Sequence, residues 1–363
     1  MKDPRIEKLA RNLLTHSIKL KKGQTVIIET NAHARELVTE LVTQVYQIGA
    51  YPFVRLGDEQ VSRAIMFGIT EDQSKRMCKY AMPLFQEAHA WIGIISNQNA
   101  FESADVPNDK KKIQTTHYGR PITDIRVKNL NWVLLQWPSA SLAQLCQTSL
   151  EAFEDFYFDV CTMDYGKMHE AMLPLQKLLG KTDRVRIVDT DTDLTFSVKG
   201  QSSVICAGSH NIPDGEIFTS PIRESVNGKI KFNIPSLHKG IMHNDIALEF
   251  QNGRVINANS SNTKELIAEL DSDEGARYIG EFAFGVNPYI KKPMNDTLFD
   301  EKIAGSIHFA LGKCYDDAPN GNESQVHWDI VHIGGEIYFD DILVRKDGKF
   351  IPKELNVLNS DKF

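Results

Sequence analysis

Cysteine is scarce in this sequence, and its few thiols form no motif. Five cysteines occur among 363 residues, and no two of them have Cys-x-x-Cys spacing. An odd number of scattered cysteines argues against a disulfide framework. We therefore expect reduced, mostly structural thiols.

Long hydrophobic runs are missing as well. A helix that spans a bilayer needs about 18 or more apolar residues in a row, whereas Ala90–Ile95 and Trp132–Trp137 are only as long as strands. Near the N-terminus, charged residues occupy the place of the apolar core of a signal peptide, and Asp3-Pro4 is typical of a helix start. We expect a soluble, cytoplasmic protein with no membrane partner.

Positive charge is not in excess. Lys and Arg number 41 against 48 Asp and Glu, which gives a net charge of -7. Proteins that bind the phosphate backbone of nucleic acids need a basic surface. We therefore expect no nucleic-acid partner.

Several common motifs of enzymes are absent. The sequence has no Gly-x-Gly-x-x-Gly, no Gly-x-x-x-x-Gly-Lys-Ser/Thr and no Gly-x-Ser-x-Gly. His169-Glu170 begins a His-Glu-x-x-His zinc motif, but position 173 is leucine. Without the second histidine one turn later, this segment lacks the paired imidazoles that hold the ion.

The first half of the chain alternates strand-like and helical segments. Apolar strand-like runs occur at Thr25–Glu29, Tyr51–Leu56 and Ala90–Ile95, and helical spacing of apolar residues occurs at Ala34–Gln47 and Glu71–Glu87. Such alternation is typical of βαβ units. It predicts an α/β domain with a mainly parallel sheet.

The second half has a different texture. After about residue 181, short apolar segments are separated by turn residues, and one helical segment lies near Asn262–Glu274. This pattern predicts a β-rich (α+β) domain. At roughly 150 residues per domain, the length also favours two domains, which we place at residues 1–181 and 182–363.

Candidate metal ligands are concentrated in the second half. His327 and Asp329 lie in a strand-like run, where side chains two residues apart share a face. His308 and Glu281 lie among apolar residues, and Glu216 follows a turn at the start of a strand-like run. Buried carboxylates are unfavourable unless they are paired or bind metal. Together these side chains form a possible ligand set for two divalent cations.

Each of these residues also has a purely structural explanation. Glu216 could support a turn, Glu281 could pair with Arg277, and His308 could be a core histidine with an ordinary hydrogen-bond partner. The order of the surrounding motifs favours the metal site. Four blocks resemble those of the aminopeptidase T and aminopeptidase S family of thermophilic-type dinuclear metallo-aminopeptidases, namely Pro213–Thr219, Gly280–Gly285, Ile307–Gly312 with Tyr315, and His327–Asp329.

The resemblance covers essentially the whole chain and implies a function. It implies a cytoplasmic, homodimeric exopeptidase that releases N-terminal amino acids from short peptides, with the site in the β-rich domain. Glu281 and Tyr315 would take part in catalysis, and Tyr315 could also bind metal or donate a hydrogen bond to the oxyanion. The metal-binding positions carried over from the family are Glu216, Glu281, His308, Tyr315, His327 and Asp329.

The resemblance implies two divalent metal ions, which could be zinc, cobalt, magnesium or manganese. The sequence leaves open which carboxylate would bridge them and which would act as general base. Two other functions also remain open. The protein could be a dinuclear amidohydrolase that acts on small non-peptide amides, or a non-catalytic protein of the same fold that binds a small molecule or metal.

Overall fold

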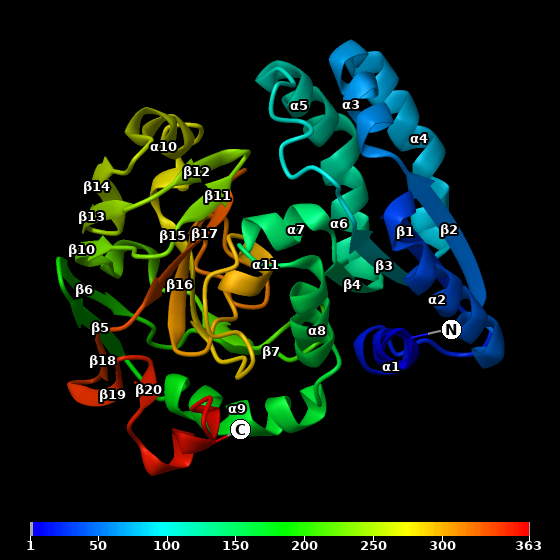
Figure 1. Cartoon of the computed structure of the whole chain (residues 1–363). Helices are drawn as coiled ribbons and strands as arrows, with labels where there is room; N and C mark the ends of the chain where they lie inside the picture. The colour runs from blue at the N-terminus through cyan, green and yellow to red at the C-terminus, as the bar shows by residue number, and fades with distance from the viewer. Residues whose placement is uncertain (1–2, 363) are drawn as a thin grey trace. The chain divides into compact units, whose positions relative to one another are not determined.

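The structure is a computed structural model that describes residues 3–362. Met1, Lys2 and Phe363, which begin and end the predicted domains, lie outside the described residues. Figure 1 follows the chain from its N-terminal helices to its C-terminal strands. No helix within residues 3–362 combines the length and the apolar character needed to cross a bilayer.

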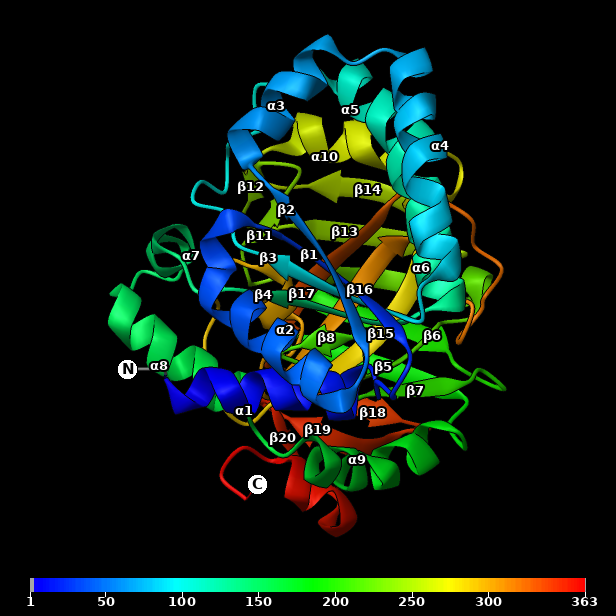
Figure 2. The same cartoon turned by 90° about the vertical axis from the view of Figure 1, so that its right-hand side faces the viewer.

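The first compact unit is built on a parallel sheet. Its strand order is β2-β1-β3-β4-β8, and every pair of neighbours runs parallel. β2 lies at one edge, beside β1 (Figure 2). The strands are β1 (Thr25–Asn31), β2 (Tyr51–Gly57), β3 (Ala90–Ile95), β4 (Asn131–Gln136) and β8 (Asn211–Ile212).

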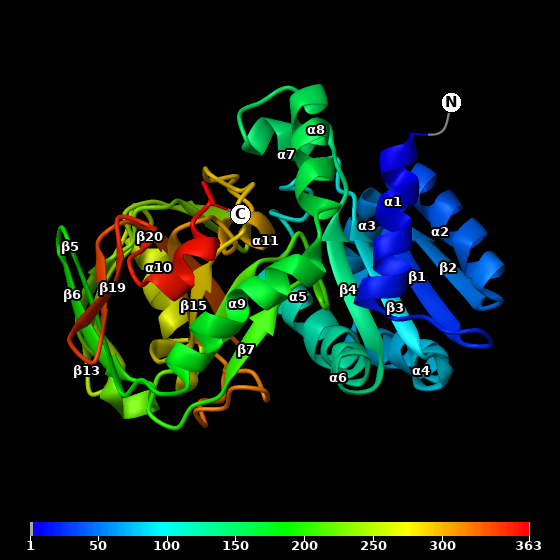
Figure 3. The ribbon, with the colours of Figure 1, turned by 90° about the horizontal axis from the view of Figure 1, so that it is seen from below.

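Helices cover both faces of this sheet, because parallel strands need crossover connections. α1 and α2 lie on one side, and α4 and α6 lie on the other (Figure 3). The first helix begins as predicted. The Asp3 carboxylate accepts a hydrogen bond from the backbone N–H of Arg5, and Pro4 is the first residue of the helix. The helices are α1 (Pro4–Asn12), α2 (Arg35–Ile48), α3 (Glu59–Gly68), α4 (Glu71–Glu87), α5 (Asn108–Gln114), α6 (Arg120–Asn129), α7 (Ala140–Leu145) and α8 (Leu150–Cys161).

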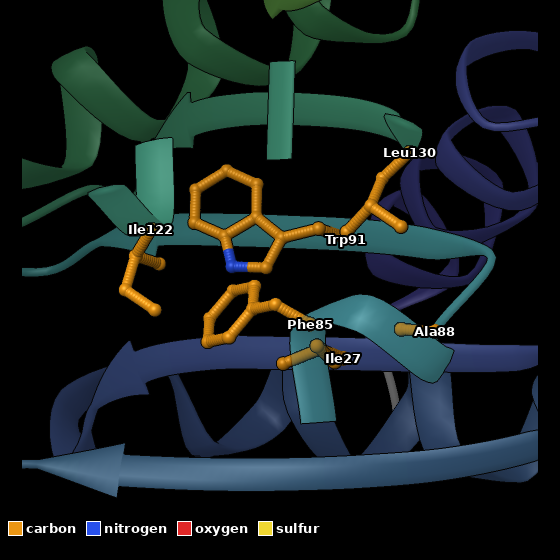
Figure 4. Close-up of a cluster of buried hydrophobic side chains, with 6 residues drawn as sticks. All are labelled: Ile27, Phe85, Ala88, Trp91, Ile122 and Leu130. Carbon is orange, nitrogen blue, oxygen red and sulfur yellow. The ribbon is translucent and has the colours of Figure 1, made fainter. Parts of the chain in front are cut away.

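One hydrophobic cluster joins the sheet to the helices on one face. Ile27 of β1 and Trp91 of β3 pack with Phe85 of α4 and Ile122 of α6 (Figure 4). Burying each of these side chains contributes about 1.5–3 kcal/mol. The cluster therefore explains why the two helices dock on this sheet.

The second unit is β-rich and mainly antiparallel. One sheet has the order β14-β13-β10-β6-β5-β18-β19-β20, another has β17-β16-β15-β9-β7, and β11 pairs with β12. The strands are β5 (Arg184–Asp189), β6 (Thr192–Ser197), β7 (Ser203–Cys206), β9 (Glu216–Thr219), β10 (Asn227–Lys231), β11 (Ser236–His238), β12 (Ile241–His243), β13 (Ala247–Gln251), β14 (Arg254–Asn259), β15 (Ile279–Gly285), β16 (Ser306–Gly312), β17 (His327–Ile333), β18 (Glu336–Phe339), β19 (Ile342–Lys346) and β20 (Lys349–Phe350).

Aromatic side chains hold the two larger sheets of this unit together. Phe196 of β6 lies with its ring centroid 4.9 Å from that of Phe282 on β15 and 5.6 Å from that of Phe309 on β16. Phe284 of β15 and Phe339 of β18 also meet edge to face, with their ring centroids 5.9 Å apart. These edge-to-face contacts fill the space between the sheets. The opposite face of β15 and β16 is therefore available for polar side chains.

The described part of the second unit contains few α-helices. They are α9 (Tyr165–Leu179), α10 (Thr263–Leu270) and α11 (Thr297–Asp300). α10 lies within the predicted helical segment at Asn262–Glu274. The predicted fold class is thus confirmed: an α/β part with a parallel sheet is followed by a β-rich part.

The division between the units differs from the predicted boundary after residue 181. Among the described residues, contacts group residues 3–163 with Gly208–Ile212, and Asp164–Ala207 with residues 213–362. Helix α9 belongs to the second unit because it contacts β7 and the 3-10 helix at Lys353–Leu358. The short strand β8 belongs to the first unit because it pairs with β4. Local sequence patterns do not reveal either of these long-range contacts.

Candidate metal centre

Strand register brings five of the predicted site residues to one face of the β17-β16-β15-β9 sheet. Asp329 lies opposite Ala310, and Ala310 lies opposite Glu281. His327, His308 and Glu216 share this face through the pairs Gly312↔His327, Ala283↔His308 and Gly285↔Glu216. Directly opposed residues point to the same side of a sheet. Four neighbouring strands therefore present two imidazoles and three carboxylates to one place.

Glycines in the motifs allow this close assembly. A Cβ at Gly312, which has φ of +97°, would lie 2.2 Å from the carbonyl oxygen of Val326. A Cβ at Gly285 would lie 2.3 Å from Ser306 Oγ and 2.5 Å from the carbonyl oxygen of Ile303. Real Cβ atoms do not approach other atoms so closely, so these positions require glycine.

The Glu281 carboxylate lies between the two histidines. Its Oε1 is 3.3 Å from His308 Nε2, and its Oε2 is 3.7 Å from His327 Nε2. Glu216 Oε2 lies 3.5 Å from His308 Nε2, and Asp329 Oδ1 lies 3.6 Å from His327 Nε2. Two groups of possible ligands in the cluster, Glu216–Glu281–His308 and Glu281–His327–Asp329, share Glu281.

Several polar atoms of the cluster have no hydrogen-bond partner among the described residues. They include Oε2 of Glu216 and Oε2 of Glu281, and both side chains are almost fully buried. A buried carboxylate oxygen without a partner is unfavourable. Carboxylate and imidazole donors directed at a common point satisfy the coordination of divalent cations. These residues therefore fit a metal site.

The histidine nitrogens are also compatible with a metal site. His327 Nδ1 lies 2.9 Å from the carbonyl oxygen of Lys313, so its N–H donates there and Nε2 is left as a free electron-pair donor. Burial would lower the pKa of His308, but the carboxylates of Glu281 and Glu216 raise it to about 9. Without metal, a proton takes the place of a cation, and metal binding must displace it.

Tyr315 lies beside this cluster, in the segment after β16. Its ring centroid is 4.7 Å from that of His327 and 5.6 Å from that of Phe218. Although 47% of the residue is exposed, burial of its hydroxyl and the charge of Glu281 raise the pKa of the phenol well above its usual value. The phenol is therefore a hydrogen-bond donor at neutral pH.

Two residues of the cluster were missed in the sequence. Glu301 is buried, and its carboxylate forms a group with the ligand atoms of His308 and Asp329 in which all lie within 4.8 Å of one another. Lys302 is fully buried and forms ion pairs with Glu301 and Glu216. The only local signal was a run of three charged residues between the apolar residues at 299 and 303.

The structural alternatives for the site residues can now be compared with the contacts. Arg277 pairs with Asp271 rather than with Glu281, at 2.7 Å. His332 lies on the other face of β17, as strand parity predicts, where its Nε2 is 3.1 Å from Asp189 Oδ2. His238 stacks on the Trp328 ring, with centroids 4.2 Å apart. These residues support the structure around the cluster and lie outside its ligand groups.

A buried cluster of carboxylates and imidazoles on a β-rich unit is the kind of site that metalloproteins use. A family model described as thermophilic metalloprotease (M29) matches residues 2–349. The chain therefore belongs to the M29 metalloprotease family, and this agrees with the resemblance seen in the sequence.

Individual proteins agree with this assignment. An aminopeptidase T from Thermus aquaticus is 25% identical, with 96% of this chain and 96% of the relative covered. Aminopeptidase AmpS from Bacillus subtilis is 24% identical, with 82% and 81% covered. The solved structure of wild-type AmpT from Thermus thermophilus superposes with a TM-score of 0.84 at 21% identity, covering 96% of this chain and 99% of that one. This superposition shows a common fold.

Proposed function

We propose that this protein removes N-terminal amino acids from short peptides at a centre that holds two divalent metal ions. The protein is a metal-dependent aminopeptidase of the M29 family. The observation that carries the proposal of two ions is the pair of ligand groups that share Glu281. A carboxylate with one oxygen toward each group is suited to bridge two cations.

Five residues would hold the ions, and a sixth, Tyr315, would bind one of them or lie beside it. Glu216 and His308 would bind one ion, His327 and Asp329 the other, and Glu281 both. Tyr315 would bind or lie next to the second ion, since its ring contacts His327. Zinc, cobalt, magnesium and manganese all accept carboxylate and imidazole ligands.

The chain's own groups would orient and stabilise the reacting peptide. When bound, divalent ions polarise the scissile carbonyl and activate water as the nucleophile. Glu281 would take part in catalysis by keeping the two histidines in a fixed relation, because its two oxygens face their Nε2 atoms. The protonated Tyr315 hydroxyl would donate a hydrogen bond to the carbonyl oxygen as negative charge develops on it.

Hydrolysis assays combined with metal analysis test this function. We expect bound divalent metal and rapid hydrolysis of an unblocked aminoacyl anilide, with no hydrolysis of its N-acylated form. Turnover of only the N-acylated form would indicate an amidohydrolase instead. A protein with neither metal nor turnover would be a binding protein of the same fold.

We also propose that the protein is a cytoplasmic homodimer. The exposed edge of the first sheet supports the dimer. β2 is an edge strand, and it exposes Tyr51, Phe53 and Leu56 by 57%, 49% and 62%. A long apolar edge strand is prone to pair with another chain unless it is covered. A second copy of the chain would cover it by symmetric pairing.

Sedimentation tests the dimer and its interface. We expect about twice the chain mass of 41.0 kDa, and a shift toward monomer in Phe53→Lys. Ile256→Lys is a matched control, because Ile256 is 49% exposed on β14, which is also an edge strand. Active wild-type enzyme that sediments only as monomer at micromolar concentration would refute the dimer.

A restricted entrance is a further part of this proposal. We expect rapid cleavage of di- to pentapeptides, slow cleavage of longer chains, and none of folded proteins. Rapid trimming of the N-terminus of a folded protein would contradict a restricted entrance.

A further inference from the structure

A lysine lies directly behind the proposed metal ligands. Lys302 is 0% exposed, and its Nζ is 3.2 Å from Oε1 of Glu216. The same ammonium forms an ion pair with Oε1 of Glu301. Fully buried lysines are rare and require such partners. We propose that Lys302 is a positioning residue of the metal centre, which fixes the Glu216 carboxylate so that one oxygen faces the cation; this inference rests on the metal site proposed above.

The backbone holds Lys302 firmly in place. Its N–H donates to the carbonyl oxygen of Phe299, and its own carbonyl accepts from the N–H of Asn287, each at 3.0 Å. An isolated parallel bridge between Asn287 and Ile303 ties the same segment to the chain that follows β15. These backbone contacts fix the position from which the Lys302 side chain reaches Glu216 and Glu301.

The two oxygens of Glu216 have different surroundings. Oε1 faces Lys302, whereas Oε2 lies 3.5 Å from His308 Nε2 and has no hydrogen-bond partner among residues 3–362. Lys302 thereby leaves one oxygen of Glu216 free to face a cation. Hydrogen-bonding partners behind metal ligands typically contribute about 10–100-fold to metal affinity.

Lys302 also connects two ends of the cluster. Glu301, its other partner, has a carboxylate oxygen within 4.8 Å of the ligand atoms of His308 and Asp329. Removing the ammonium would leave two buried carboxylates without their shared counter-charge. We expect both carboxylates to move, and the geometry around a bound cation to change with them.

The test uses the full chain stripped of metal and titrated with Co²⁺, whose visible absorption reports ligand geometry. Lys302→Met should bind Co²⁺ at least about tenfold more weakly than the wild type and change the Co²⁺ spectrum. Lys302→Arg should recover most of the affinity, because it keeps the charge. Lys239→Met is a control, since it removes another lysine from an ion pair with a glutamate, Glu269, in the same unit.

The outcomes separate this inference from the proposed function. If Lys302→Met kept the wild-type Co²⁺ affinity and spectrum, the positioning role would be overturned. A lower melting temperature in that variant would not rescue it, because a lysine with a purely structural role would also lower the melting temperature when replaced. Wild-type protein that binds no Co²⁺, or Glu216→Gln that binds it as tightly as wild type, would instead overturn the metal site itself.

A second pair of variants keeps the test possible if Lys302→Met does not fold. The double variant Glu301→Gln with Lys302→Met removes both members of a buried ion pair. Neither charge of that pair is then left buried without its partner. It is compared with Glu301→Gln alone. We expect a further loss of Co²⁺ affinity of about tenfold or more in the double variant, and equal affinities would overturn the inference.

Discussion

Two histidines five residues apart on β17 are expected to respond to substitution in opposite ways. His327 faces the carboxylate cluster, with its Nε2 3.6 Å from Asp329 Oδ1. His332 faces away from it, and its two nitrogens contact Asp189 Oδ2 at 3.1 Å and the carbonyl oxygen of Lys231 at 3.0 Å. Alanine at position 327 should remove metal, whereas alanine at position 332 should reduce stability.

The magnitudes follow from burial and hydrogen bonding. His332 is 1% exposed, so His332→Ala loses two hydrogen bonds of about 1 kcal/mol each and leaves a cavity, together about 3 kcal/mol. The His327 side chain is 26% exposed and makes one hydrogen bond, to the carbonyl oxygen of Lys313. His327→Ala should therefore reduce the free energy of unfolding by only about 1 kcal/mol.

Metal affinity should show the reverse order. His327→Ala removes a direct ligand and should weaken metal binding by more than about 100-fold. This is a larger loss than the one expected when a residue that only hydrogen-bonds to a ligand is replaced. His332→Ala should bind metal like the wild type. Urea unfolding of the metal-free proteins measures stability, and competition with a coloured chelator measures affinity. If His332→Ala lost metal as completely as His327→Ala, the assignment of the two faces of β17 would be wrong.

Further predictions concern ligand charge, pH and metal removal. Glu216→Gln and Asp329→Asn should each abolish turnover and leave the fold intact, because they keep the side-chain shape and remove ligand charge; wild-type activity at saturating metal would exclude either residue from the site. Burial would raise the pKa of Glu269, but hydrogen bonds from His238 and Lys239 lower it to about 2 from 4.5. The lowered pKa stabilises the folded state by about 3 kcal/mol above pH 4.5, and this contribution is lost as the pH falls toward 2. Urea unfolding should therefore show Glu269→Gln less stable than wild type at neutral pH, with the difference shrinking in acid; a constant difference would contradict the pairing. Turnover should fall on the acid side, since ligand histidines must be deprotonated, and exhaustive chelation should stop it. Full activity in protein shown by elemental analysis to hold no metal would contradict the proposed chemistry.

Much of the local structure could be predicted because it depends on neighbours in the sequence. The helical spacing in Glu71–Glu87 and the apolar run in Ala90–Ile95 match α4 and β3. Strand parity predicted that His327 and Asp329 share a face, and the same parity accounts for His332 on the opposite face. These features follow from the periods of helices and strands, which short stretches of sequence express directly.

The sequence by itself thus determined the type of most elements and, through four ordered motifs, the family. Only the tertiary structure decided that α9 joins the β-rich unit, that Glu281 lies between His308 and His327, and that Lys302 turns inward to Glu216. Each of these facts depends on register and packing between segments far apart in the chain. Such contacts are selected by burial of the whole core rather than by local preference, so no short pattern contains them.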